Sequence, residues 1–97
     1  MGYYTDFDIS GNSEEIAEAI EETSGYFGWY DRRINAKWYD WQNHCLKVSE
    51  RFPEEIVVVE GVGEEHGDMW KAYFNNGKMQ IANAVITYEP FDKSKLE

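Results

Sequence analysis

The sequence predicts an α+β domain, in which two helices pack on one antiparallel sheet and the elements follow the order β-α-β-α-β-β-β. Three observations lead to this class. The first segment alternates two sets of side chains, as a half-buried strand does. Two later segments repeat apolar residues at steps of three and four, which is typical of amphipathic helices. The second half then contains successive β-forming runs, two of them joined by a tight-turn sequence.

The first strand is expected over residues 3–9, because its side chains alternate in character with a period of two. The inward set would be Tyr3, Thr5, Phe7 and Ile9. Asn12, with Glu15 three residues later, is expected to begin the first helix as a capping box. An apolar stripe carries this helix to about residue 23 and consists of Ile16, Ala19, Ile20 and Thr23.

A connection rich in glycine and aromatic residues is expected over residues 24–33, followed by a short strand around residues 35–39. Asp40 is expected to cap a second helix, which ends before Pro53. The apolar stripe of this helix consists of Trp41, Cys45, Val48 and Phe52.

Three strands are expected in the second half. Residues 56–59 and 69–74 are strongly β-forming and should pair antiparallel across a glycine-containing connection. Asn76-Gly77 supplies the positive φ angles of a type I′ hairpin turn, which leads into a last strand over residues 79–88.

The apolar faces of these elements define a predicted core. Its members are Phe7, Ile9, Ile16, Ile20, Trp41, Cys45, Val48, Phe52, Ile56, Val58, Trp70, Phe74 and Ile86. The 97 residues suit a single domain, expected over residues 1–95. The remaining two residues, Leu96 and Glu97, match the cloning remnant that often precedes an affinity tag.

The formal net charge of −10 disfavours direct contact with nucleic acid or an anionic membrane, because phosphates favour Lys and Arg. An apolar share of 42% and an aromatic share of 16% give the chain enough material for a core. Its single cysteine cannot form an internal disulfide, and we find neither a signal peptide nor a long apolar stretch. We therefore expect a protein of the cytosol.

A polar cluster in the second half, together with His44, has the residue types of a metal site. It consists of Glu64, Glu65, His66 and Asp68. Adjacent residues of a continuing strand point to opposite faces, and the segment lacks the alternating oxygen ligands of an EF-hand. We therefore interpret it as a hairpin turn and expect no bound metal or cofactor.

Cys45 follows His44 directly, but neighbouring helix positions diverge by about 100° and cannot act as a nucleophile and its base. We interpret Cys45 as a core thiol and do not expect an enzyme. The aromatic residues of the same region could stack on bases, but they lack the basic groove of single-strand binders. Core filling with a partial protein-contact surface is preferred for this set, which is Tyr26, Phe27, Trp29, Tyr30, Trp38, Tyr39 and Trp41.

Acidic residues concentrate in two blocks without Lys or Arg, residues 1–31 and 54–68. In the first helix Glu14, Glu18 and Glu22 recur at steps of four, and each like-charge pair costs about 0.2–0.5 kcal/mol. These steps space the carboxylates by about 6 Å along the axis, near the spacing of successive phosphates on a nucleic-acid strand. Mimicry of nucleic acid and simple solubility both account for this row. The candidate partner-binding residues are Glu14, Glu18, Glu21, Glu22, Glu64, Glu65 and Asp68.

Four segments in roughly the C-terminal two-thirds of the chain share features with known proteins. They are Ala36-Lys37-Trp38-Tyr39, Ser49-Glu50-Arg51-Phe52-Pro53, residues 61–70 and residues 73–78. These segments resemble small proteins of phages and mobile elements, and the Lys-Trp strand, helix and Phe-Pro boundary are similar to ferredoxin-like domains of uncharacterised plasmid and phage proteins. The resemblance implies a ferredoxin-like fold and a phage or plasmid setting. Small acidic phage domains also resemble anti-CRISPR proteins as a class, and the acidic first third departs from the ferredoxin-like pattern.

Two functions follow as expectations. The first is an inhibitor from a phage or mobile element, which presents carboxylates to the basic nucleic-acid-binding groove of a host defence protein such as a CRISPR effector in the bacterial cytosol. The alternative is an accessory or structural interaction domain of a mobile element, with the charge serving solubility and a homodimer formed through the sheet face or the aromatic loop.

Overall fold

The described residues form five strands, two α-helices and one short 3₁₀-helix in the computed structural model, which describes residues 3–27, 31–65, 67–85 and 87–96. The strands are β1 (Thr5–Asp8), β2 (Arg33–Ala36), β3 (Val57–Gly63), β4 (Met69–Asn75) and β5 (Lys78–Asn83). The helices are α1 (Glu14–Ser24), α2 (Trp41–Arg51) and the 3₁₀-helix η1 (Lys93–Lys95). The predicted element order is therefore confirmed.

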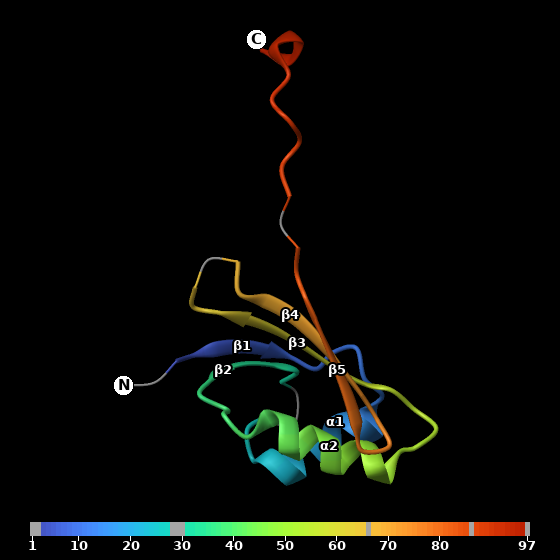
Figure 1. The fold of residues 1–97 in the computed structure, drawn as a ribbon. Helices are drawn as coiled ribbons and strands as arrows, with labels where there is room; N and C mark the ends of the chain where they lie inside the picture. The colour runs from blue at the N-terminus through green and yellow to red at the C-terminus, as the bar shows by residue number, and fades with distance from the viewer. Residues whose placement is uncertain (1–2, 28–30, 66, 86, 97) are drawn as a thin grey trace.

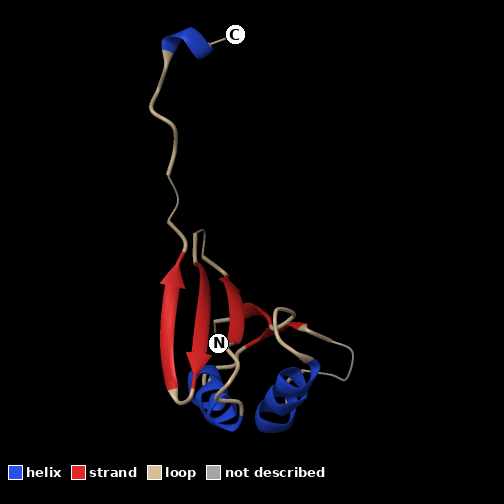
Figure 2. Cartoon of the chain, turned by 90° about the vertical axis from the view of Figure 1, so that its right-hand side faces the viewer, coloured by secondary structure: helices blue, strands red, loops and turns tan. Residues whose placement is uncertain are grey.

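All five strands belong to one antiparallel sheet with the order β2-β1-β3-β4-β5. The two helices pack against each other and cover one face of this sheet (Figure 1). The α+β class with two helices on an antiparallel sheet is confirmed, and the strand order is consistent with a ferredoxin-like arrangement. The chain after β5 continues away from the helix layer (Figure 2).

The core lies between the sheet and the two helices. Seven of its predicted members are buried, namely Phe7, Ile9, Ile16, Ile20, Cys45, Val48 and Phe74. Three more, Trp41, Phe52 and Trp70, are partly buried and pack against it. Ile86 lies outside the described residues.

The predicted inward face of β3 was wrong by one residue. Val57 and Val59 are buried, whereas Val58 is half-buried and Ile56 lies exposed before the strand. A shift of one residue moves every side chain of a strand to the opposite face. Four consecutive β-forming residues carry no alternation of polarity, so the face could not be deduced locally.

The second strand ends earlier than expected, at Ala36. Trp38 follows it and is buried, with its ring centroid 5.1 Å from that of Phe7 and 5.5 Å from that of Phe27. Phe27 is also buried, whereas Tyr26 and Tyr39 are exposed. Trp29 and Tyr30 lie outside the described residues. Core filling is thus confirmed for Phe27 and Trp38.

The predicted capping box of α1 was also wrong, because Ser13 is the N-cap and its Oγ accepts a hydrogen bond from the Ile16 N–H. Asn12 instead joins the segment before α1 to β3 through side-chain hydrogen bonds. Its Nδ2 donates to the carbonyls of Ile9 and Val58 at 2.9 and 2.6 Å, and its Oδ1 accepts from the Val58 N–H at 2.7 Å.

Asp40 occupies the N-cap position of α2 as expected, but its side chain makes no capping hydrogen bond. Its Oδ1 instead accepts from Nδ2 of Asn43 at 2.7 Å. α2 ends at Arg51, shortly before Pro53, in agreement with the predicted end of the helix.

The β4–β5 hairpin has the predicted turn. Asn76 and Gly77 have φ angles of 45° and 78°, the positive values that a type I′ turn requires. The last strand, however, ends at Asn83 and does not reach residue 88. The Ala84 N–H donates to the carbonyl of Met69, where β4 begins, and beyond this bond the strand has no partner to pair with.

Candidate interaction surfaces

The predicted acidic row lies on the outer face of α1. Glu14, Glu18 and Glu22 are exposed, and Glu21 is half-buried. The inner face is fixed in the core by four buried residues, Ile16, Ala17, Ala19 and Ile20. Core packing therefore fixes the position of α1, and the carboxylates are already arranged before any partner binds.

The negative charge of this face is not neutralised locally. Among the described residues, no ion pair involves a glutamate of α1. The last turn of the helix has no basic residue, so Glu21 and Glu22 lie at the negative end of the helix dipole. A surface of this kind attracts basic partners over a distance set by the ionic strength.

The second predicted acidic set lies in the turn between β3 and β4, where it is bonded to the N-terminal segment. The Tyr3 hydroxyl donates to Oδ2 of Asp68 at 2.6 Å and accepts from the Glu65 N–H at 2.9 Å. The Glu64 carboxylate accepts from the Tyr4 N–H. The hydrogen bond to Asp68 raises the pKa of Tyr3 above its usual value.

The three acidic residues of this turn have different roles. Asp68 is half-buried and fixes the N-terminal segment, whereas the side chains of Glu64 and Glu65 are exposed. Glu65 contributes its backbone N–H to the same network and leaves its carboxylate available to a partner.

The structure does not bring the two acidic sets together. α1 belongs to the helix layer, whereas β3 ends and β4 begins at the far side of the molecule from that layer, as both ribbon views show (Figures 1 and 2).

The residues considered for metal or nucleophilic chemistry have structural roles where they are described. Cys45 is fully buried, and this burial raises its pKa to about 12, which keeps it as a thiol. Nδ1 of His44 accepts a hydrogen bond from the Trp38 indole, so the two residues form a packing unit. No group of three or more potential metal ligands occurs in the described part of the chain, and His66 lies outside it.

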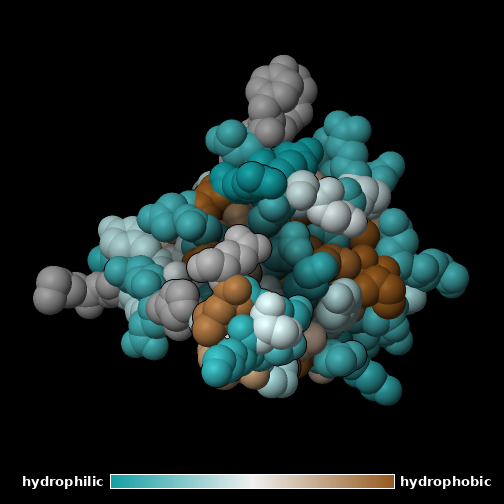
Figure 3. Space-filling view, turned by 90° about the horizontal axis from the view of Figure 1, so that it is seen from above, coloured by the Kyte–Doolittle hydropathy of each residue, from teal (hydrophilic) through white to brown (hydrophobic). Residues whose placement is uncertain are grey.

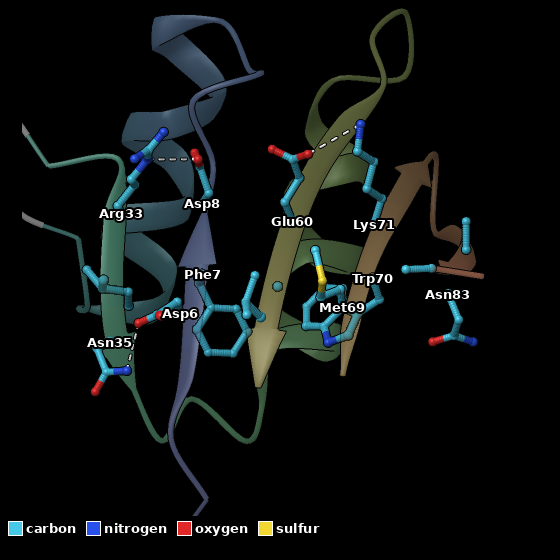
Figure 4. A pocket seen from close by; sticks show the side chains of 15 residues that line it. Asp6, Phe7, Asp8, Arg33, Asn35, Glu60, Met69, Trp70, Lys71 and Asn83 are labelled. Atoms are coloured by element: carbon cyan, nitrogen blue, oxygen red, sulfur yellow. Dashed lines mark hydrogen bonds and ion pairs between the residues drawn. The ribbon is translucent and has the colours of Figure 1, made fainter. Parts of the chain in front are cut away.

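A third surface is a groove on the sheet face opposite the helices, the face that the sequence analysis considered for a homodimer (Figure 4). We call it the concave groove; its volume is about 720 Å³ and all five strands contribute to its lining. The charged residues that line it are Asp6, Asp8, Arg33, Glu60 and Lys71.

Cross-strand pairs organise these charges. Nε of Arg33 lies 2.9 Å from Oδ2 of Asp8, and Nζ of Lys71 lies 3.3 Å from Oε1 of Glu60. Partial burial favours a raised pKa for Asp8, but hydrogen bonds from Ser10 and the Arg33 guanidinium outweigh it and hold the pKa below its usual value. The alternation of β1 placed Asp6 and Asp8 on one face, but their partners depend on strand register.

The concave groove also contains an apolar pair on β3 and β4, next to the Glu60–Lys71 pair on the same two strands. Val62 and Met69 are direct neighbours across β3 and β4, and both are exposed. In the space-filling view from above, hydrophobic residues appear as separate patches among hydrophilic ones (Figure 3). An apolar pair beside paired charges suits the binding of an extended peptide.

Comparison with protein-family models, curated proteins and solved structures finds no match to this chain. Within the described residues, no helix has both the length and the apolar character needed to cross a membrane.

Proposed function

We propose that this chain is a non-catalytic binding module that inhibits a host defence system, by presenting the acidic face of α1 to the basic nucleic-acid-binding groove of a protein such as a CRISPR effector. In this proposal the chain comes from a phage or mobile element and acts in the bacterial cytosol. Inhibition results from occupancy of the groove, so it requires neither turnover nor a cofactor.

The observation that carries the proposal is the exposure of Glu14, Glu18 and Glu22 on a helix whose other face is fixed in the core. In the described part of the chain, no basic residue forms an ion pair with these glutamates. Their spacing of about 6 Å per step along the axis supports contact with successive phosphate-binding side chains. The carboxylates of the 64–68 turn face another side, so we assign them a secondary contact at most.

The second candidate function is an accessory interaction domain, and the concave groove favours it. Its exposed Val62 and Met69 belong to a surface that is separate from α1 and suited to a peptide rather than to a basic groove. In this case the charge of α1 would serve solubility.

Charge reversal on α1 separates the two functions. The double variant Glu18→Lys with Glu22→Lys is compared with the double variant Glu54→Lys with Glu55→Lys. This matched control changes the net charge equally, at exposed residues that are not among the candidate partner-binding residues. The probe is a panel of purified CRISPR effector–guide RNA complexes, and the readout is inhibition of DNA cleavage at two salt concentrations.

We expect the α1 variant to lose potency at least tenfold at low salt and less at high salt, because charge reversal across an interface costs several kcal/mol when desolvated. The control should keep its potency. Equal potency of the wild type and the α1 variant would eliminate mimicry, and failure of the wild type on the whole panel would remove CRISPR effectors as its targets.

A further inference from the structure

The chain after β5 forms an arm that leaves the body of the molecule. We call residues 84–96 the C-terminal arm, of which all but residue 86 are described. It extends away from both sheet and helices (Figures 1 and 2). The radius of gyration is accordingly 16.5 Å, whereas a compact chain of this length has about 12.5 Å.

The C-terminal arm exposes large apolar side chains. Val85, Tyr88 and Phe91 are 80–85% exposed, more than any other large hydrophobic residue described in this chain. Isolated exposed apolar residues are common, but three within seven residues of one extended segment indicate a segment that is covered by something else.

The first part of the C-terminal arm favours an extended chain. Residues 84–89 contain none of Gly, Pro, Asn and Asp, which most often form tight turns, and the first such residue after them is Pro90. Val85 and Thr87 are β-branched and favour an extended backbone. The C-terminal arm is therefore suited to reach a second molecule.

The charge of the C-terminal arm also suits a second copy of this chain. Residues 84–96 contain Glu89, Asp92, Lys93 and Lys95, so their formal charges cancel, whereas the whole chain carries −10. A neutral segment can approach a second acidic copy with less repulsion than other parts of the surface.

The concave groove provides a matching site. The C-terminal arm starts at its edge, since Ala84 lines the groove and its N–H donates to the Met69 carbonyl at 2.8 Å. The exposed Val62 and Met69 offer apolar contacts. Asp6 and Asp8, bonded within one copy to Asn35 and Arg33, offer further carboxylate acceptors to Lys93 or Lys95 of an incoming arm.

We propose that the chain forms a symmetric dimer in which the C-terminal arm of each copy lies in the concave groove of the other. The nine residues 84–92, which precede η1, reach about 30 Å when extended, enough to cross from one sheet to another. Such reciprocal exchange gives a closed two-fold assembly, in which Tyr88 and Phe91 of one copy cover Val62 and Met69 of its partner. This proposal is independent of the proposed inhibition, because the acidic face of α1 takes no part in it. It uses the same concave groove as the second candidate function and assigns a second copy of this chain as the occupant.

Two full-length variants test the exchange. The arm variant is Tyr88→Ser with Phe91→Ser, and the groove variant is Met69→Lys. Sedimentation equilibrium over a range of concentrations gives the dimer dissociation constant, and circular dichroism verifies folding. Met79→Ser is the control, because Met79 is exposed on β5 but lies outside both the C-terminal arm and the concave groove.

We expect the wild type and the control to have equal dimer dissociation constants. The arm variant and the groove variant should each have a dissociation constant at least tenfold higher. An equimolar mixture of the arm and groove variants should associate more strongly than either alone, because it contains one intact arm and one intact groove. A monomeric wild type would overturn the proposal. So would unchanged dimerisation of the arm variant, a mixture no more associated than its components, or loss of the dimer in the control, which would assign the contact to the edge of β5.

Discussion

The indole Nε1–H of Trp38 donates a hydrogen bond to Nδ1 of His44 at 2.8 Å, which fixes the tautomer of that histidine. A neutral imidazole that accepts at Nδ1 carries its proton on Nε2, and this nitrogen lies 3.3 Å from Oδ2 of Asp40. The segment before α2 is thus joined to the first turns of the helix. Trp38 is buried, so its N–H depends on His44 for its hydrogen bond in the folded chain.

Replacement of His44 by Ala should therefore lower the free energy of unfolding by about 1–3 kcal/mol, the cost of an unsatisfied buried donor. Asp40→Ala is the control, because the Asp40 side chain is largely exposed and such pairs contribute about 0–1 kcal/mol. Urea denaturation measures both variants. Wild-type stability of His44→Ala would show that the hydrogen bond contributes little.

Asn12 should be sensitive to a change of a single atom. Asn12→Asp keeps the acceptor for the Val58 N–H but loses the donor and places a negative charge beside the carbonyls of Ile9 and Val58. We expect both Asn12→Asp and Asn12→Ala to lose about 1–3 kcal/mol. The exposed amide of Asn43 bonds to Asp40 and to no other side chain among the described residues, so it should tolerate Ala within about 0.5 kcal/mol. Equal effects at the two asparagines would contradict the assigned role of Asn12.

Gly61 is required by the packing of its cross-strand neighbour Trp70, because a Cβ at this position would overlap the indole ring. Gly61→Ala should cost about 1–3 kcal/mol, as is usual for overpacking. Gly11→Ala is the matched control, since a Cβ there would be in ordinary van der Waals contact with Val58. If thermal denaturation shows equal losses for the two variants, backbone freedom and not the Trp70 contact would explain the requirement.

The type and order of the elements could be predicted because they depend on local periodicity. α1, α2 and the Asn76-Gly77 turn each have their signal within a few residues. The details that were wrong depend on distant residues. The choice between Asn12 and Ser13 as the cap depends on Val58, 46 positions away, and the end of β5 depends on where β4 begins.

The candidate surfaces follow the same division. The acidic row on α1 was predictable because residues four apart share a helix face, and its exposure agrees with that pattern. The concave groove was not, because it joins Asp8 to Arg33 and Glu60 to Lys71 across strands. Strand register depends on turn lengths and on which face is buried, and neither is contained in one segment.

Asp8 should contribute to acid sensitivity. Its folded-state pKa lies below the ordinary value of 3.8, so the unfolded chain binds the proton more readily and the stabilisation is present above about pH 4. It is lost as the pH falls through the lower, folded-state pKa. Asp8→Asn should thus show a smaller loss of stability between neutral and acidic pH than the wild type. If the stability of Asp8→Asn falls between neutral and acidic pH as much as that of the wild type, this contribution is contradicted. Arg33→Gln should likewise show a smaller loss of stability over this pH range than the wild type.

Glu18 is the residue at which relief of self-repulsion in α1 should be largest. It lies three or four positions from Glu14, Glu15, Glu21 and Glu22, so Glu18→Lys converts several repulsive neighbours into attractive ones. We expect a gain of about 1 kcal/mol at low salt, which corresponds to a rise in Tm of about 4–8 °C for a domain of this size. The gain should shrink in 1 M salt, where the Debye length falls to about 3 Å. Glu54→Lys changes the net charge equally from an exposed position outside a helix. If calorimetry gives both variants the same rise in Tm, the stability gain comes from net charge alone. The glutamate row of α1 would then cause no local repulsion beyond that of the net charge.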